Sequence, residues 1–110
     1  MNILDTIVAK KKVEIAAAKE RISVEGLSQQ DFFSRHTYSL CSFLQNETRT
    51  GIIAEFKRKS PSKGIINATA EVEEVTTAYA AAASGISVLT DTDFFGGTSE
   101  DLQRARIQQV

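Results

Sequence analysis

The sequence predicts an α/β protein in which short parallel strands alternate with helices. Two apolar segments, residues 52–56 and residues 86–90, are compatible with strands and too short for helices. A helical pattern over residues 70–84 separates them, and a further helical pattern follows the second segment. Strands that alternate with helices in this way are typical of parallel pairing through crossover helices.

The first part of the chain carries helical patterns. A long amphipathic helix is predicted over residues 2–22. Its apolar and small residues form one stripe: Leu4, Val8, Ile15, Ala18 and Ile22. Ser28 followed by Asp31 fits a capping box that opens a short helix through the next two phenylalanines. Another short helix is predicted near residues 40–45, and residues 46–51 form a polar break.

The middle of the chain is a loop followed by a helix. Residues 57–67 form the loop, which Pro61 and Gly64 punctuate. In the helix over residues 70–84, one stripe is made by Val72, Val75, Tyr79 and Ala82. Gly85 stands where a C-terminal cap of that helix belongs.

The last part repeats the order of loop and helix. Residues 91–97 form a second loop that ends in a pair of glycines. Thr98 and Asp101 then have the spacing of a capping box. We therefore predict a helix from this point to the end of the chain.

Composition restricts the class of protein. The chain has 110 residues, of which 42% are hydrophobic and 25% charged, as expected for one small soluble domain. Its net charge of −1 argues against nucleic acid or a membrane as partner. No apolar run reaches the roughly 20 residues of a membrane helix, and the N-terminus does not resemble a signal peptide. With one cysteine, Cys41, no internal disulfide can form, so we expect a cytoplasmic protein.

A candidate site lies at the end of the first strand. Residues two apart in a strand point to the same face, so Glu55 and Lys57 project together. In parallel α/β folds, ligands bind at this end of the strands. A carboxylate beside an ammonium group can hold a polar substrate or take part in proton transfer. The alternative interpretation is a surface ion pair.

The loop beyond the strand is rich in positive charge and hydroxyl groups. Four of the seven residues from 57 to 63 are basic: Lys57, Arg58, Lys59 and Lys63. Ser60 and Ser62 add hydroxyl groups on either side of the rigid Pro61. In a nearly neutral protein this local charge suggests a small anionic ligand, such as a carboxylate or a phosphate. A solubilising loop is the alternative.

Metal binding is not predicted. Three residues of the second loop match the first, third and sixth places of a calcium loop: Asp91, Asp93 and Gly96. The twelfth place, which requires a glutamate, is Leu102, and the fifth is Phe95. His36 and Cys41 have no partners at metal-ligand spacing; we expect Cys41 in the core and His36 on the surface.

Two adjacent aromatic residues give the second loop another role. Phe94 and Phe95 follow the second strand, so they can reach over a pocket at the strand ends. An aromatic pair there suits a planar apolar part of a ligand. The alternative is that both rings belong to the core.

Three stretches resemble the indole-3-glycerol phosphate synthase family. IIAEFKRKSPSKGII resembles the family signature of an apolar pair, any residue, Glu, an apolar residue, Lys, two variable residues and Ser-Pro-Ser. GISVLTDTDFFGGTSEDL is similar to the family's second strand and loop. ILDTIVAKKKVEIAAAKE is similar to the helical extension before the first strand, so the resemblance spans nearly the whole chain.

The resemblance implies a (β/α)8 TIM barrel and an activity in tryptophan biosynthesis. This carbon–carbon lyase closes the indole ring of 1-(2-carboxyphenylamino)-1-deoxyribulose 5-phosphate with loss of CO2 and water. No metal or organic cofactor is implied. Residues 1–51 would form the helical extension, and residues 52–110 the first two strand–helix units of the barrel.

The resemblance also implies roles for individual residues. Glu55 and Lys57 match the active-site pair on the first strand. Lys57 would contact the carboxylate side of the anionic substrate, and Glu55 would hydrogen-bond its reacting part. Ser60 matches the loop serine at the site. Ser62, in the same Ser-Pro-Ser run, is also expected to bind the substrate. Phe95 matches the aromatic residue that packs on the substrate's ring.

Length separates this chain from a whole barrel. A TIM barrel takes about 250 residues, and two of its eight strands are recognisable here. The general acid, the general base and the phosphate-binding loops of the family are expected beyond Val110. We therefore expect the chain alone to be inactive, and its unpaired strand edges to favour self-association.

Two other functions are alternatives to this interpretation of the sequence. One is a non-catalytic fragment that binds anions or a partner. The other is a different phosphate-handling barrel, such as the isomerase of the same pathway. The run Glu-x-Lys-x-x-Ser-Pro-Ser argues against that isomerase.

Overall fold

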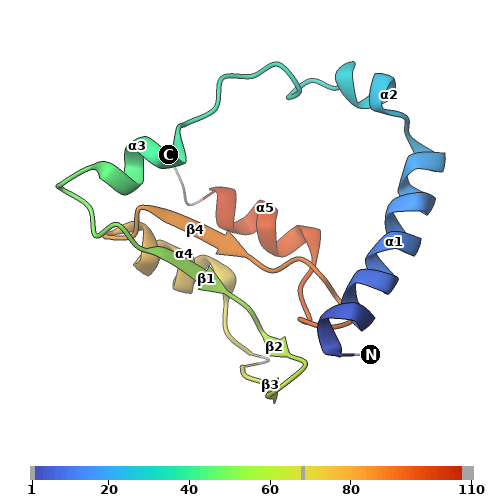
Figure 1. Ribbon diagram of the computed structural model, residues 1–110. Helices are drawn as coiled ribbons and strands as arrows, with labels where there is room; N and C mark the ends of the chain where they lie inside the picture. Colours follow the sequence, from blue (N-terminus) through green and yellow to red (C-terminus); the bar gives the residue numbers. More distant parts are fainter. Residues whose placement is uncertain (1, 68, 108–110) are drawn as a thin grey trace. The chain divides into compact units, whose positions relative to one another are not determined.

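The computed structural model describes residues 2–67 and 69–107. The chain divides into two compact units, Met1–Tyr38 and Ser39–Val110. The first holds α1 (Ile3–Arg21) and α2 (Val24–Ser28), and the second holds the strands and the remaining helices. Figure 1 follows the chain from the blue helix α1 to the red helix α5.

The long N-terminal helix is confirmed to within one residue at each end. The Asn2 side chain accepts a hydrogen bond from the Asp5 backbone N–H at 2.8 Å, and the Asp5 carboxylate accepts one from the Asn2 N–H at 3.4 Å. This capping box fixes the start of α1. None of the helix's residues is buried, and Leu4 of the apolar stripe is 63% exposed.

The predicted helix start at Ser28 is wrong. The capping serine is Ser23, whose hydroxyl accepts a hydrogen bond from Gly26 N–H at 3.0 Å and opens α2. Ser28 is the last residue of that helix, and its hydroxyl donates to Glu25 O at 2.6 Å. The following phenylalanines lie in turns, because the Phe33 N–H donates to Gln30 O at 3.1 Å, three residues back.

The second unit confirms a mixed α/β arrangement with parallel strands. Its elements, in order, are α3 (Leu40–Gln45), β1 (Ile53–Phe56), β2 (Lys59–Ser60), β3 (Gly64–Ile65), α4 (Val72–Ala80), β4 (Gly85–Val88) and α5 (Ser99–Ile107). Strands β1 and β4 pair in parallel, and the chain passes between them through α4 (Figure 1). The predicted continuation of the last helix over residues 108–110 lies outside the described residues.

The helix before β4 is shorter than the pattern predicts. It ends at Ala80, and the next residues turn, with the Ala83 N–H donating to Tyr79 O at 2.8 Å. Gly85 is the first residue of β4 and not a helix cap. A Cβ atom on Gly85 would lie 2.8 Å from the Leu40 side chain, so the glycine allows α3 to approach the sheet.

The loop after β1 contains a short hairpin that the sequence pattern does not predict. Strands β2 and β3 form a small antiparallel hairpin, in which Ser60 lies opposite Gly64. Gly64 has a φ of +66°, a conformation that favours glycine. Two-residue strands are too short to show alternation, so no hydrophobic pattern could indicate them.

The core of the second unit lies on one face of the β1–β4 sheet. Phe56 of β1, Val72 of α4 and Ala105 of α5 are buried together, and Val88 of β4 packs against them. Phe56 and Val88 are register partners, so this face is covered by α4 and α5. The opposite face carries the alternate residues of both strands.

Two further properties concern the described residues. Cys41 lies in α3 and is exposed, so its predicted place in the core is wrong. Within residues 2–67 and 69–107, no helix is both long and apolar enough to cross a membrane.

Candidate active site

Glu55 and Lys57 lie together at the end of β1. The Glu55 Oε1 atom is 3.8 Å from the Lys57 Nζ atom, and the two side chains are 46% and 39% exposed. Both point away from the face that α4 and α5 cover, because they alternate with the buried Phe56. The pair is accessible to a ligand from the open face of the sheet.

Ser87 on the neighbouring strand completes the surroundings of the carboxylate. It is the register partner of Glu55, and its hydroxyl donates a hydrogen bond to Glu55 Oε2 at 3.1 Å. No motif in the sequence indicates a role for Ser87. Its alternation with Gly85 on one face of β4 was visible, but only the strand register places it beside Glu55.

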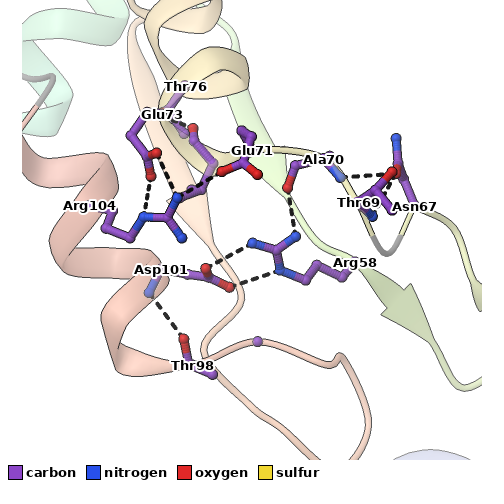
Figure 2. A network of polar contacts seen from close by, with 12 residues as sticks. Arg58, Asn67, Thr69, Ala70, Glu71, Glu73, Thr76, Thr98, Asp101 and Arg104 are labelled. Carbon is purple, nitrogen blue, oxygen red and sulfur yellow. Dashed lines mark hydrogen bonds and ion pairs between the residues drawn. The ribbon is translucent and has the colours of Figure 1, made fainter.

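Arg58 does not belong to the predicted anion-binding cluster. Its Nε and Nη2 atoms donate to the Asp101 carboxylate at 3.1 and 2.9 Å, and its Nη1 atom donates to Ala70 O at 2.7 Å (Figure 2). The guanidinium carbon lies 5.1 Å from the centre of the Phe56 ring. The hydrogen bond with Asp101 raises the pKa of Arg58. The charge is therefore satisfied inside the protein, and that part of the prediction is wrong.

The same polar network joins α4 to α5. Arg104 of α5 forms ion pairs with Glu71, at 2.8 Å, and with Glu73 near the start of α4 (Figure 2). Thr98 accepts a hydrogen bond from the Asp101 N–H at 3.1 Å, which is one half of the predicted capping box. The Asp101 carboxylate binds Arg58, so Asp101 fixes the helix start and the loop after β1 at once.

The two serines of the loop lie in the β2–β3 hairpin. Ser60 is buried, and its hydroxyl accepts a hydrogen bond from the Lys63 N–H at 3.2 Å. Its Oγ atom is 3.4 Å from that of Ser62, which is exposed. Among the described residues, no hydrogen bond links either serine to Glu55 or Lys57. The structure thus brings the serines to each other and leaves their role toward the pair as a prediction.

The second loop is ordered by Asp91. Its Oδ2 atom accepts hydrogen bonds from the backbone N–H groups of Phe94 and Phe95 at 2.7 and 3.3 Å. Both phenylalanines are partly buried. The Phe95 carbonyl accepts a hydrogen bond from the Lys59 N–H at 3.3 Å, which ties this loop to the hairpin.

A cavity of about 340 Å³ lies between the two loops. Its walls are Arg58, Lys59, Ile65, Thr92 and Gly96. Phe94 and Phe95 are not among its lining residues, so the role of the aromatic pair toward a ligand stays a prediction. The part of the chain that the structure describes holds no cluster of three or more His, Cys, Asp or Glu residues suited to a metal ion.

Comparison with known proteins points to one family. Residues 4–109 match the sequence model of indole-3-glycerol phosphate synthase. The protein of that name from Bacteroides thetaiotaomicron is 43% identical over 106 residues, which are 96% of this chain and 40% of the relative. Those from Listeria monocytogenes and Syntrophobacter fumaroxidans are 43% and 39% identical and are covered over 38% and 41% of their length. The chain thus spans about 40% of the length of these curated relatives.

Proposed function

Because this chain belongs to the indole-3-glycerol phosphate synthase family, we propose that it contributes the first two strand–helix units of a ring-closing enzyme of tryptophan biosynthesis. The substrate is 1-(2-carboxyphenylamino)-1-deoxyribulose 5-phosphate. Its indole ring closes with loss of CO2 and water. The observation that carries the proposal is the Glu55–Lys57 pair, which lies at the end of β1 within the family's matching residues.

The proposed enzyme is a (β/α)8 barrel in which β1 and β4 are neighbouring strands. Their parallel pairing and the α4 crossover support this arrangement. Helices α4 and α5 cover one face of the sheet, as helices cover the outside of a barrel. Glu55 and Ser87 lie on the opposite face, which would become the barrel interior. The boundary between the helical extension, residues 1–51, and the barrel units, residues 52–110, stays a prediction.

The proposed chemistry uses the charges of the pair. The substrate carries a carboxylate and a phosphate, so the Lys57 ammonium group would bind its anionic carboxylate side. The Glu55 carboxylate would accept hydrogen bonds from the reacting part of the substrate and orient the neighbouring lysine. Loss of water requires a proton for the departing oxygen, and the family's general acid is expected beyond the present residues.

The remaining proposed contacts come from the two loops. The hydroxyl groups of Ser60 and Ser62 would donate to substrate oxygens, and their position in one hairpin supports a shared role. Phe95 would pack on the aromatic ring of the substrate. The backbone hydrogen bond from the Lys59 N–H to Phe95 O couples the hairpin to this loop.

A joined enzyme tests the proposal. The chain replaces the matching first part of the Bacteroides relative, to which it is 43% identical, and formation of the indole product is followed by its fluorescence. We expect ring closure within about tenfold of the intact relative, because the family's other residues are then present. The isolated chain serves as the control and should give no turnover.

A folded joined protein without turnover would contradict the proposal. If it bound the substrate or inorganic phosphate with no reaction, the non-catalytic anion-binding alternative would be favoured. Folding of the joined protein is checked separately by circular dichroism, so that a misfolded product is not mistaken for an inactive one.

A further inference from the structure

We propose that Ser87 is a positioning residue that fixes the Glu55 carboxylate for the reaction. The inference rests on the proposed function, since it concerns the same site. Ser87 belongs to β4 and Glu55 to β1, and the two are register partners in the parallel sheet. Ser87 lies in the stretch that is similar to the family's second strand, where the resemblance assigns no residue to the site.

The two oxygens of Glu55 have different partners. The Ser87 hydroxyl donates to Oε2 at 3.1 Å, and the Lys57 ammonium group lies 3.8 Å from Oε1. An ionised carboxylate has about four acceptor positions. The hydrogen bond to Oε2 and the positive charge near Oε1 together orient the group, and they leave acceptor positions free for a substrate.

Ser87 is the more rigid of these two partners. Its short side chain has one rotatable χ angle, and its backbone is held by the ladder between β1 and β4. Lys57 has a long side chain that is 39% exposed, and an ion pair of this kind is weak and screened by salt. A half-exposed glutamate held only by Lys57 would therefore sample several rotamers. The serine selects one of them.

A purely structural role explains Ser87 less well. Its side chain lies on the face opposite the buried cluster of Phe56, Val72 and Ala105, so it does not contribute to that packing. Because Ser87 is only partly buried, water could replace Glu55 as the partner of its hydroxyl with little loss of stability. Its specific effect is on the carboxylate that it contacts.

The first test uses the 110-residue chain itself. The variants are Ser87→Ala, which removes the hydroxyl, and Ser87→Thr, which keeps it. Ser84→Ala is the matched control, because it removes a serine hydroxyl that accepts a bond from Gly51 N–H at 2.9 Å, away from Glu55. The readout is the carbon resonance of the Glu55 carboxylate at neutral pH.

We expect the Glu55 resonance to move in Ser87→Ala and to stay in place in Ser87→Thr and Ser84→Ala. An unchanged resonance in Ser87→Ala would overturn the proposal. This readout does not depend on turnover. If the joined enzyme shows no ring closure, the proposed function fails, while the resonance still decides the Ser87 contact.

The second test measures kcat and KM in the joined enzyme. Removing one hydrogen bond to a charged group should lower kcat about tenfold in Ser87→Ala and change KM less than about twofold. Ser87→Thr should recover most of the loss. Equal kcat values in Ser87→Ala and the unmodified enzyme, or a loss in Ser87→Thr as large as in Ser87→Ala, would contradict a positioning role.

Discussion

Lys57 shows how a two-residue spacing in a strand brings two charged side chains together. Its ammonium group lies 3.8 Å from Glu55, and both side chains are substantially exposed. An exposed ion pair of this kind contributes about 1 kcal/mol or less to stability. The pair therefore adds little to the stability of the fold, and its role at a ligand site is the proposal that mutation can test.

Replacing Lys57 by methionine separates these two roles. Lys57→Met keeps the length of the side chain and removes its charge. We expect ring closure in the joined enzyme to fall at least about 100-fold, because the substrate carboxylate loses its cation. The free energy of unfolding should change by less than about 1 kcal/mol. Steady-state kinetics and urea unfolding measure both.

Lys19→Met is the matched control for this change. Lys19 is exposed on α1, which belongs to the first compact unit, so the same loss of charge occurs outside the unit that contains β1. Its kinetics should equal those of the unmodified enzyme. Full activity in Lys57→Met would remove the proposed role of the lysine.

At the scale of elements, the Arg58–Asp101 pair connects the loop after β1 with α5. The side chains are 19% and 6% exposed, and two hydrogen bonds join them. Because the pKa of Arg58 is raised, the arginine's contribution is present below its ordinary pKa and is lost only as the pH rises through the higher folded value. The guanidinium group therefore stays charged throughout the neutral range.

Removing the Asp101 carboxylate should destabilise the folded protein. Asp101→Ala leaves Arg58 without its main partner in a partly buried place, so we expect a loss of about 2 kcal/mol in the free energy of unfolding. Glu100→Ala changes the neighbouring exposed acid of the same helix and should cost less than about 0.5 kcal/mol. Urea unfolding compares the two variants. Equal losses would contradict the importance of the pair.

Gly97 is required where the second loop returns to β4. A Cβ atom at this position would lie 1.8 Å from Leu89 O, so Gly97→Ala forces the backbone apart. Gly64→Ala is the comparison, because Gly64 has a φ of +66° with no heavy atom within 4 Å of the added carbon. Gly64→Ala should lower the free energy of unfolding by about 1 to 2 kcal/mol. We expect the larger loss in thermal unfolding for Gly97→Ala, and the reverse order would refute the close approach.

The sequence predicted those elements whose signals are local. Residues 40–45 and the first strand are close to their predicted bounds, because spacing of apolar residues determines them. The predicted helix cap at Ser28 is wrong, because Ser23 offers the same capping chemistry five residues earlier and opens α2. The Arg58–Asp101 pair joins residues 43 apart in sequence, and no periodic pattern carries such information.

At the scale of the whole molecule, the candidate site was predictable only in part. The same-face placement of Glu55 and Lys57 follows from strand geometry, and the structure brings them together. The contact with Ser87 depends on register, which is set by pairing between distant segments. Arg58 resembles a binding residue because the sequence shows its charge but does not show that it pairs with Asp101.

The β1–β4 sheet also predicts how the isolated chain behaves. It has two strands, and Ile53 on its open face is 49% exposed. Unpaired edges and apolar faces promote association. In sedimentation experiments we expect the apparent mass of the chain to rise above the monomer mass of 12.0 kDa as the concentration increases. Ile53→Lys should reduce this self-association. A constant monomer mass at all concentrations would contradict the expectation.

The most direct test of the central claim is a crystal structure of the joined enzyme with the product indole-3-glycerol phosphate bound. The claim is that the Glu55–Lys57 end of β1 forms part of the ring-closing site. We expect the Lys57 Nζ atom within about 3.2 Å of a ligand oxygen, with the Glu55 carboxylate also in contact. A ligand bound with both side chains out of reach would contradict it.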